Sequence, residues 1–188
     1  MLGRLGVVVA VVALGCGGRP APLGSWDGGG SGDAVALDFC QGQARAEING
    51  AAMPVQAAGE MMYLDCCEAA GVVFAPVGTG HRIFVSWRRS GGPMPTSPIT
   101  LDLASLPPQW GVSVTVDCDE QTGCSTSGNL WAGKLQGTLT ITTLDQYQYP
   151  AYDMTLCLQG VENQVAPQPS VYSMRLWASH VVAQVDIK

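Results

Sequence analysis

The 188-residue sequence predicts an all-β fold: an antiparallel β-sandwich or barrel of roughly 8–11 short strands, with at most one short helix and with stabilising disulfides. Three observations predict it. Apolar and polar side chains alternate with a period of two along much of the chain. Turn-forming residues separate the alternating segments at a spacing of roughly ten residues. Seven cysteines are present, and cysteines in such number favour an oxidising compartment.

The alternation is clearest in five segments. Successive side chains of a strand point to opposite faces of its sheet, so one face of each segment joins a core and the other meets water. The five segments are 99–103, 112–116, 138–142, 153–158 and 174–178. Further strand candidates are 43–48, 52–57, 72–77, 82–88 and 181–187.

Turn chemistry supports this interpretation at one place and leaves a choice at another. Asn49-Gly50 lies between two strand candidates and predicts a tight hairpin, because both central positions of such a turn require positive φ. The segment Ala57–Ala70 is rich in helix formers, yet its apolar residues also fit one face of a strand. This segment therefore stays open as a short helix or a strand.

Composition excludes some function classes. Hydrophobic residues make up 47% of the chain and charged residues only 13%, which predicts a packed core and not a disordered chain. The formal net charge is −6, and the largest basic cluster is the pair Arg88-Arg89. Nucleic-acid binding, which needs many cations to neutralise phosphates, is therefore excluded. The sequence contains no phosphate-loop pattern, and no cofactor is expected.

The N-terminus has the organisation of an export signal. Arg4 gives a positive head, and the uncharged apolar run from Leu5 to Leu14 is too short to span a membrane, which needs about 20 residues. The segment Ala13-Leu14-Gly15-Cys16 then resembles the lipobox of bacterial lipoproteins. The resemblance covers residues 1–17 alone. It implies that residues 1–15 are a signal peptide and that Cys16 receives lipid, which anchors the chain to a membrane.

The lipobox is not matched at every position. The family prefers Leu three positions before the cysteine, where this chain has Ala13, and the spacing of Ala13 and Gly15 also fits an ordinary secretion signal. The alternative is thus a freely secreted protein with a spare thiol at Cys16. Gly17 is not the Asp that retains such lipoproteins at the inner membrane, so the resemblance implies the outer membrane. Residues 16–33 are predicted as a flexible Gly-rich tether, and residues 34–188 as one β domain.

The cysteine count fits this organisation. With Cys16 lipidated, an even set of six remains, which allows 15 disulfide connectivities. Cys118 and Cys124 flank a turn and are expected to pair. Cys66 and Cys67 are neighbours that cannot easily bridge each other, so they are expected to pair separately with Cys40 and Cys157, in an open order. The spacings match no zinc motif.

No catalytic or metal site is predicted. His81 and His180 lie in no known catalytic motif. A hydrolase that uses either of them is therefore the least favoured of three hypotheses, and it requires an acidic partner and a nearby hydroxyl in a cleft. Asp117, Asp119 and Glu120 do not follow the order of an EF-hand calcium loop and are predicted to form a solvated acidic loop.

The first hypothesis is a non-enzymatic interaction module of the bacterial envelope, held at the membrane by its lipid, with an envelope protein or glycan as partner. The second is a β domain that binds a glycan or lipid. In this second hypothesis Trp110 and Trp131, which flank loops, form an exposed aromatic surface on which the ligand stacks.

Overall fold

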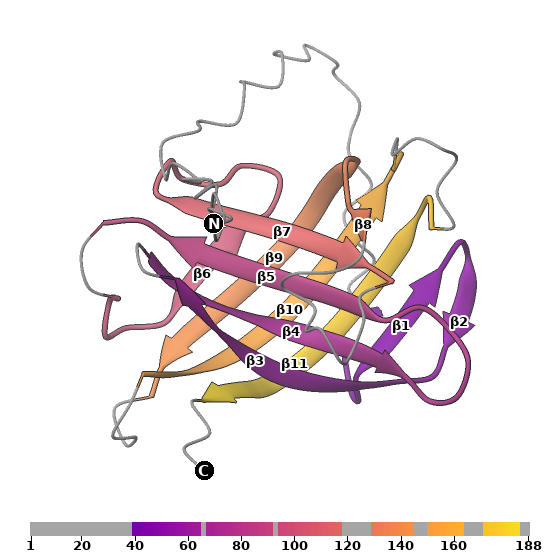
Figure 1. Ribbon diagram of the computed structural model, residues 1–188, viewed down its shortest axis with the longest axis horizontal. Helices are drawn as coiled ribbons and strands as arrows, with labels where there is room; N and C mark the ends of the chain where they lie inside the picture. Colours follow the sequence, from indigo (N-terminus) through magenta and orange to yellow (C-terminus); the bar gives the residue numbers. More distant parts are fainter. Residues whose placement is uncertain are drawn as a thin grey trace, which may run out of the picture. The chain divides into compact units, whose positions relative to one another are not determined.

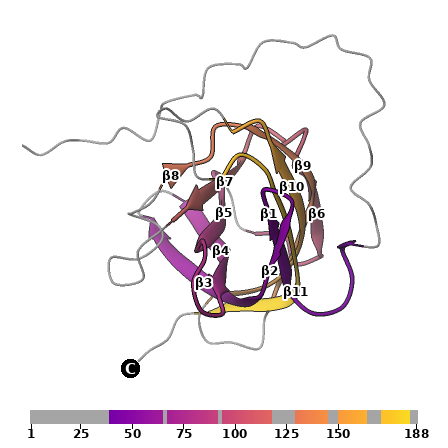
Figure 2. The same cartoon turned by 90° about the vertical axis from the view of Figure 1, so that its right-hand side faces the viewer.

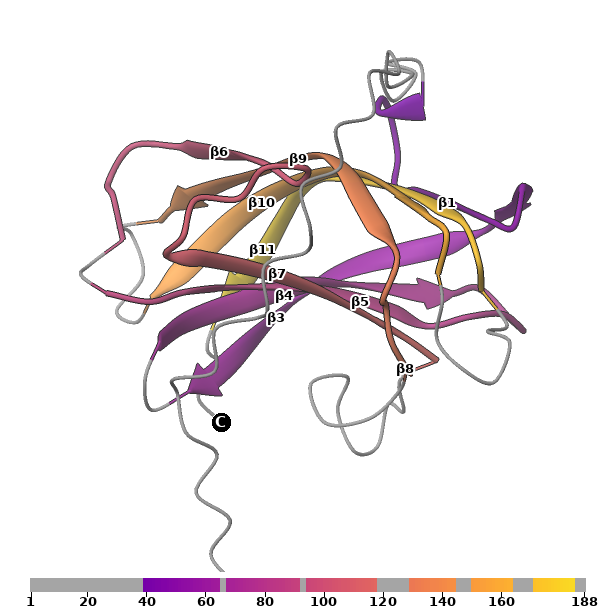
Figure 3. The same cartoon turned by 90° about the horizontal axis from the view of Figure 1, so that it is seen from above.

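The computed structural model describes residues 39–64, 67–91, 94–117, 129–144, 150–163 and 171–184. Within these ranges the chain forms two antiparallel sheets packed face to face, with eleven strands and no α-helix. Figure 1 shows the sheets from one side, and Figures 2 and 3 show the two layers edge-on. The predicted fold class is confirmed as a β-sandwich.

The first sheet, sheet A, has six strands in the order β2-β1-β11-β10-β9-β6. Their bounds are β1 Arg45–Ile48, β2 Ala51–Met53, β6 Ile99–Asp102, β9 Lys134–Thr143, β10 Ala151–Val161 and β11 Met174–Gln184. The second, sheet B, has five strands in the order β3-β4-β5-β7-β8. Their bounds are β3 Val55–Leu64, β4 Cys67–Pro76, β5 Ile83–Arg89, β7 Trp110–Val116 and β8 Asn129–Leu130.

The core lies between the sheets, and along strands such as β10 alternate residues face inward, as the period-two pattern predicts. On β10, for example, Met154, Leu156 and Leu158 are fully buried. The ring of Trp87, from sheet B, meets the ring of Tyr152 edge-on at a centroid distance of 5.0 Å. The indole N–H of Trp87 also donates to Sδ of Met154 at 3.3 Å. These contacts tie the two layers together at the centre of the sandwich.

The predicted Asn49-Gly50 hairpin is present between β1 and β2, with φ of 53° at Asn49 and 81° at Gly50. The Asn49 side chain adds contacts that the pattern did not predict. Its Oδ1 accepts hydrogen bonds from the backbone N–H groups of Tyr172 at 2.9 Å and Ser173 at 3.2 Å. The hairpin is therefore fastened to the start of β11.

The segment left open as helix or strand forms strands. Val55–Leu64 pairs with Cys67–Pro76, in a ladder that ends at Leu64 opposite Cys67. The helix propensity of this segment is worth a few tenths of a kcal/mol per residue, and the long ladder and core contacts outweigh it. Ala57 and Met61 of β3 pack against the core, as one face of a strand should.

The two expected segments 174–178 and 181–187 are joined in one strand, β11, which the structure describes to Gln184. The inward positions change parity along it, from Leu176 and Ala178 to Val181 and Ala183. A β-bulge explains the change, because the register with β10 shifts between Met154 and Leu156. One extra residue in β11 restores the inward face after the shift.

Candidate functional site

A disulfide joins Cys40 to Cys157, whose Cα atoms lie 5.6 Å apart. The prediction that these two cysteines pair separately with Cys66 and Cys67 is therefore wrong. Cys157 lies on the solvent-facing side of β10 in sheet A, between the buried Leu156 and Leu158, whereas Cys67 starts β4 in sheet B. The alternation of apolar and polar residues shows which face of a strand is buried, but it does not show which sheet the strand joins.

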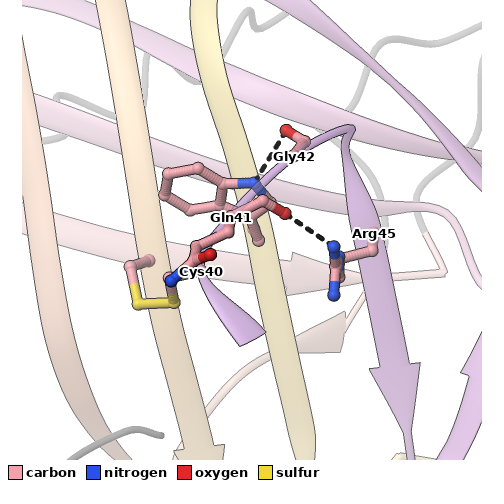
Figure 4. Close-up of a disulfide and its surroundings, with 6 residues drawn as sticks. Cys40, Gln41, Gly42 and Arg45 are labelled. Carbon is pink, nitrogen blue, oxygen red and sulfur yellow. Dashed lines mark hydrogen bonds between the residues drawn. A yellow bond between two sulfur atoms is a disulfide. The ribbon is translucent and has the colours of Figure 1, made fainter. Parts of the chain in front are cut away.

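The segment before β1 lies over this outer face of sheet A (Figure 4). The indole N–H of Trp177, on β11, donates to the carbonyl of Gly42 at 3.1 Å, and the Arg45 guanidinium donates to the carbonyl of Gln41 at 2.7 Å. The guanidinium of Arg175 stacks on the ring of Phe39, 4.2 Å from its centroid. The disulfide and these contacts hold residues 39–45 across β11, a role that the sequence pattern did not reveal.

A groove of about 450 Å³ begins beside the N-terminal end of β1, at Ala44. β1 pairs with β11 only as far as Arg45 opposite Trp177, so the later part of β11 has β10 on one side and the groove on the other. The far wall of the groove is β3, the edge strand of sheet B. The groove is lined by Ala44, Ala57, Ala58, Gly59, Ser179, His180, Val181, Val182 and Gln184.

β3 crosses β11 at Gly59, where the two backbones are in direct contact. A Cβ atom at this position would overlap the backbone of Val182 and Ala183. Figures 1 and 2 show the same crossing of the two sheets at this end of the sandwich. Only glycine permits so close an approach, and both Gly59 and Val182 line the groove.

His180 lies at the rim of the groove, at the bulge of β11. Its φ of 54° places a non-glycine residue in the left-handed region. Nδ1 of the ring is 3.1 Å from Oδ2 of Asp153, and the backbone N–H donates to Oγ1 of Thr155 at 3.4 Å. The hydrolase hypothesis required an acidic partner, a cleft and a nearby hydroxyl. Here the acidic partner and the groove are present, but the Thr155 hydroxyl contacts the backbone of His180 and not its ring.

His81 also has an acidic partner, since its Nδ1 lies 2.6 Å from Oδ1 of Asp117. Both side chains are about one third exposed, and Asp117 has a φ of 58° at the end of β7. His81 precedes β5 in sheet B, so the structure does not bring it together with His180, which is in sheet A. The two histidines are thus separate surface pairs.

The aromatic platform predicted at Trp110 and Trp131 is not formed, because both side chains are buried, with exposures of 8% and 7%. Trp110 packs against Trp87 at a centroid distance of 5.7 Å, and Trp131 packs against the backbone of Gly160. Flanking loops suggested exposure, but Trp110 is an inward-facing residue at the start of β7, and Trp131, just after β8, is buried as well. Neither indole is available to stack on a sugar.

Some predicted residues lie outside the described ranges: Cys16, Cys66, Cys118, Cys124, Asp119, Glu120 and the tether 16–33. Among the residues that are described, no three His, Cys, Asp or Glu side chains gather where they could hold a metal ion. The same residues include no helix long and apolar enough to cross a membrane.

In comparisons with protein-family models, with curated proteins and with solved structures, the chain matched none of them.

Proposed function

We propose that this protein is an exported, lipid-anchored interaction module of the bacterial cell envelope. In this proposal Cys16 carries the lipid, residues 17–33 are the tether, and the β-sandwich is displayed outside the cytoplasm, at the outer membrane. Its partner is an envelope component, which it binds without chemical conversion.

The observation that carries the proposal is the disulfide between Cys40 and Cys157. Disulfides of this kind form and persist in oxidising compartments, which supports export. The bridge also fastens the N-terminal end of the described domain, the end that the tether would join. An anchored domain gains from such a fastening, because a force applied through the tether would meet the disulfide before it reached β1.

The lipid assignment rests on the lipobox resemblance, and the free energy of burying acyl chains in a membrane makes such an anchor stable. Each buried methylene contributes about 0.8 kcal/mol, so a doubly or triply acylated cysteine holds a domain stably at a membrane where one chain does not. The groove between β3 and β11 supports a binding role, since its volume of about 450 Å³ is in the range of ligand sites.

The proposal is tested by expressing the full chain in a diderm bacterium fed with an alkyne-labelled fatty acid. We expect label on the wild type and its partition into the detergent phase of Triton X-114. Cys16→Ser should remove the label, whereas Cys124→Ser, the matched cysteine control, should keep it. Recovery of unlabelled wild-type protein as a soluble product that begins near residue 16 would show ordinary secretion and contradict the proposal.

The location is tested separately with Gly17→Asp. By the retention rule of the family that the N-terminus resembles, this variant should move from the outer-membrane to the inner-membrane fraction of a sucrose gradient. If the wild type itself fractionates with the inner membrane, the outer-membrane assignment is wrong while lipidation stands.

A further inference from the structure

We propose that the outer face of sheet A binds an extended, uncharged polysaccharide chain. The binding surface, which we call the hydroxyl–amide face, lies on β6, β9 and β10 and consists of Thr100, Gln136, Thr138, Thr140, Thr142, Thr155 and Gln159. It shares no residue with the groove between β3 and β11. The inference deepens the proposed function by naming the class of partner, and it rests on that function only for where the partner is met.

Strand alternation turns these side chains away from the core. On β9, Leu139 and Ile141 are buried, so Thr138 and Thr140 lie on the opposite face of the sheet. The same alternation holds on β6 and β10, whose inward residues are buried too. All members of the hydroxyl–amide face are exposed or partly exposed, and Thr138 and Thr100 are the most open of them. A ligand can therefore reach the face from solvent.

The strand register places the side chains in rows across the sheet. Gln136 lies opposite Gln159, and Thr140 lies between Thr155 on one side and Thr100 on the other. Neighbouring strands are about 4.8 Å apart, and residues on the same face of one strand are roughly 7 Å apart. The hydroxyl and amide groups thus form a two-dimensional array on a rigid sheet. An extended chain of sugar rings can contact such an array at several points.

The side chains of this face have hydrogen-bonding capacity to spare. The hydroxyl groups of Thr100 and Thr140 bond to each other at 3.0 Å, and each keeps a further lone pair. None of the hydrogen bonds among the described residues involves the side chains of Gln136, Thr138 or Gln159. Hydroxyl and amide groups both donate and accept, as sugar hydroxyls do, so a sugar can replace the water on this face.

The face itself is uncharged. Among the described residues of β6, β9 and β10, the charged side chains are Asp102, Lys134 and Asp153, which lie towards the strand ends. Lys134 is paired with Glu162 at 2.9 Å, and the Asp153 carboxylate lies 3.1 Å from the His180 ring. A charged partner would lose water over the centre of the face without gaining an opposite charge. The seven side chains also include no large apolar group for a lipid chain, so a neutral sugar fits best.

The lack of charge distinguishes this face from the outer face of sheet B. Threonine favours strands on any solvent-facing sheet, so threonine alone would indicate no ligand. On sheet B, however, Glu60 and Arg88 face outward, since their neighbours Met61 and Trp87 pack into the core. The same chain thus places charges on one outer sheet face and keeps them off the centre of the other.

The disulfide borders the hydroxyl–amide face on the side of β11. Cys157 lies opposite Trp177 in the β10–β11 ladder, and its bond to Cys40 holds the segment before β1 beside the face (Figure 4). Trp177 is only partly buried, and its indole N–H donates to the carbonyl of Gly42. An aromatic ring beside an array of hydroxyl groups offers the apolar side of a sugar ring a surface to stack on. The aromatic partner that a glycan needs is thus on the outer face of sheet A.

The test uses the full chain, purified in an amine-oxide detergent, which carries no sugar. The neutral probes are β-1,4-linked hexamers of glucose and of N-acetylglucosamine. The charged probes are hexamers of glucosamine, which is basic, and of galacturonic acid, which is acidic. Calorimetry in about 0.3 M salt gives the affinities, because the net charge of the chain is then largely screened. Tryptophan fluorescence reports contact with Trp177, since Trp87, Trp110 and Trp131 are buried.

We expect at least one neutral hexamer to bind, and both charged hexamers to bind about tenfold more weakly or less. Thr138→Ala and Gln159→Ala should each weaken binding about threefold to tenfold, because each removes one hydrogen-bonding group. Gln56→Ala and Thr115→Ala, the matched changes on sheet B, should leave the affinity unchanged. Trp177→Phe should keep most of the affinity and remove the fluorescence change.

The proposal is overturned if neither neutral hexamer binds up to about 5 mM, or if a charged hexamer binds as tightly as a neutral one. Equal weakening by the variants of both sheets would also overturn it, because the sugar would then not contact the hydroxyl–amide face. Ala58→Phe fills the groove, and a loss of binding in that variant with none in Thr138→Ala and Gln159→Ala would assign the sugar to the groove. In each case the fatty-acid labelling of the wild type still decides the anchoring on its own.

Discussion

Cys40 and Cys157 are separated by 117 positions in the chain, yet one disulfide joins them across the outer face of sheet A. Closing so long a loop restricts the unfolded chain strongly, and the chain-entropy model gives a stabilisation of about 5 kcal/mol. We therefore expect the double variant Cys40→Ala/Cys157→Ala to lose about 2–5 kcal/mol of unfolding free energy in urea denaturation, the range measured for native bridges.

The matched control for this loss is Gln159→Ala, on the same face of β10, which should change the stability by no more than about 0.5 kcal/mol. If the double variant unfolds at the midpoint of the wild type, the bridge does not constrain the unfolded chain, and its proposed role in fastening the tether end fails with it.

A second prediction concerns Asn49. Its side chain accepts two backbone hydrogen bonds, from Tyr172 and Ser173, while its backbone holds a positive φ. Asn49→Ala should cost about 2–3 kcal/mol, because it leaves both donors without their acceptor and places alanine in the left-handed region. Asn49→Asp keeps an acceptor and should cost less. Asn49→Gly keeps the turn but not the acceptor, so it separates the two contributions in thermal or chemical denaturation.

The sequence predicted the class of the fold because burial on one face of a strand leaves a period-two trace, as in Met154, Leu156 and Leu158. It also predicted the Asn49-Gly50 hairpin, because few residues adopt the backbone of that turn. It did not predict the pairing of Cys40 with Cys157, because alternation fixes the face of a strand but not its neighbours. Sheet order is decided by contacts between distant segments.

The same limit applies to the candidate site. After Ala178 the apolar positions shift by one residue, and for this reason the sequence predicted two separate strands. A β-bulge accounts for the shift within a single strand. The groove itself left no such signal, because it arises from the length mismatch of β1 and β11 and from the crossing at Gly59. Trp110 and Trp131 were misjudged because proximity to a loop says little about which way a ring points.

His180 provides a third prediction, on the bulge. Alanine and histidine both carry a Cβ, so His180→Ala should keep the backbone strain and report only the exposed contact with Asp153, a change within about 0.5 kcal/mol. His180→Gly should be equal to the wild type or more stable by up to about 1 kcal/mol, since glycine adopts this φ freely. His180→Val should lose about 1–3 kcal/mol, because a β-branched residue fits the left-handed region poorly. Equal stability of the valine and glycine variants would argue against the bulge geometry.

The last prediction concerns pH. Burial raises the pKa of Glu60 above its ordinary value near 4.5, although the positive charge of Arg82 acts to lower it. The folded protein therefore binds the Glu60 proton more tightly than the unfolded chain does. Stability from this group is fully present below about pH 4.5 and is lost as the pH rises through the folded pKa.

It follows that Glu60→Gln, which cannot ionise, should be more stable than the wild type at pH 7, by less than about 1 kcal/mol because the group is only partly buried. The advantage should vanish below about pH 4.5, where the wild-type carboxyl is also neutral. Urea titrations at both pH values measure it, with Glu162→Gln as a control, since that side chain is 58% exposed. A glutamine variant that is less stable than the wild type at pH 7 would mean that attraction between Glu60 and Arg82 outweighs the cost of burial.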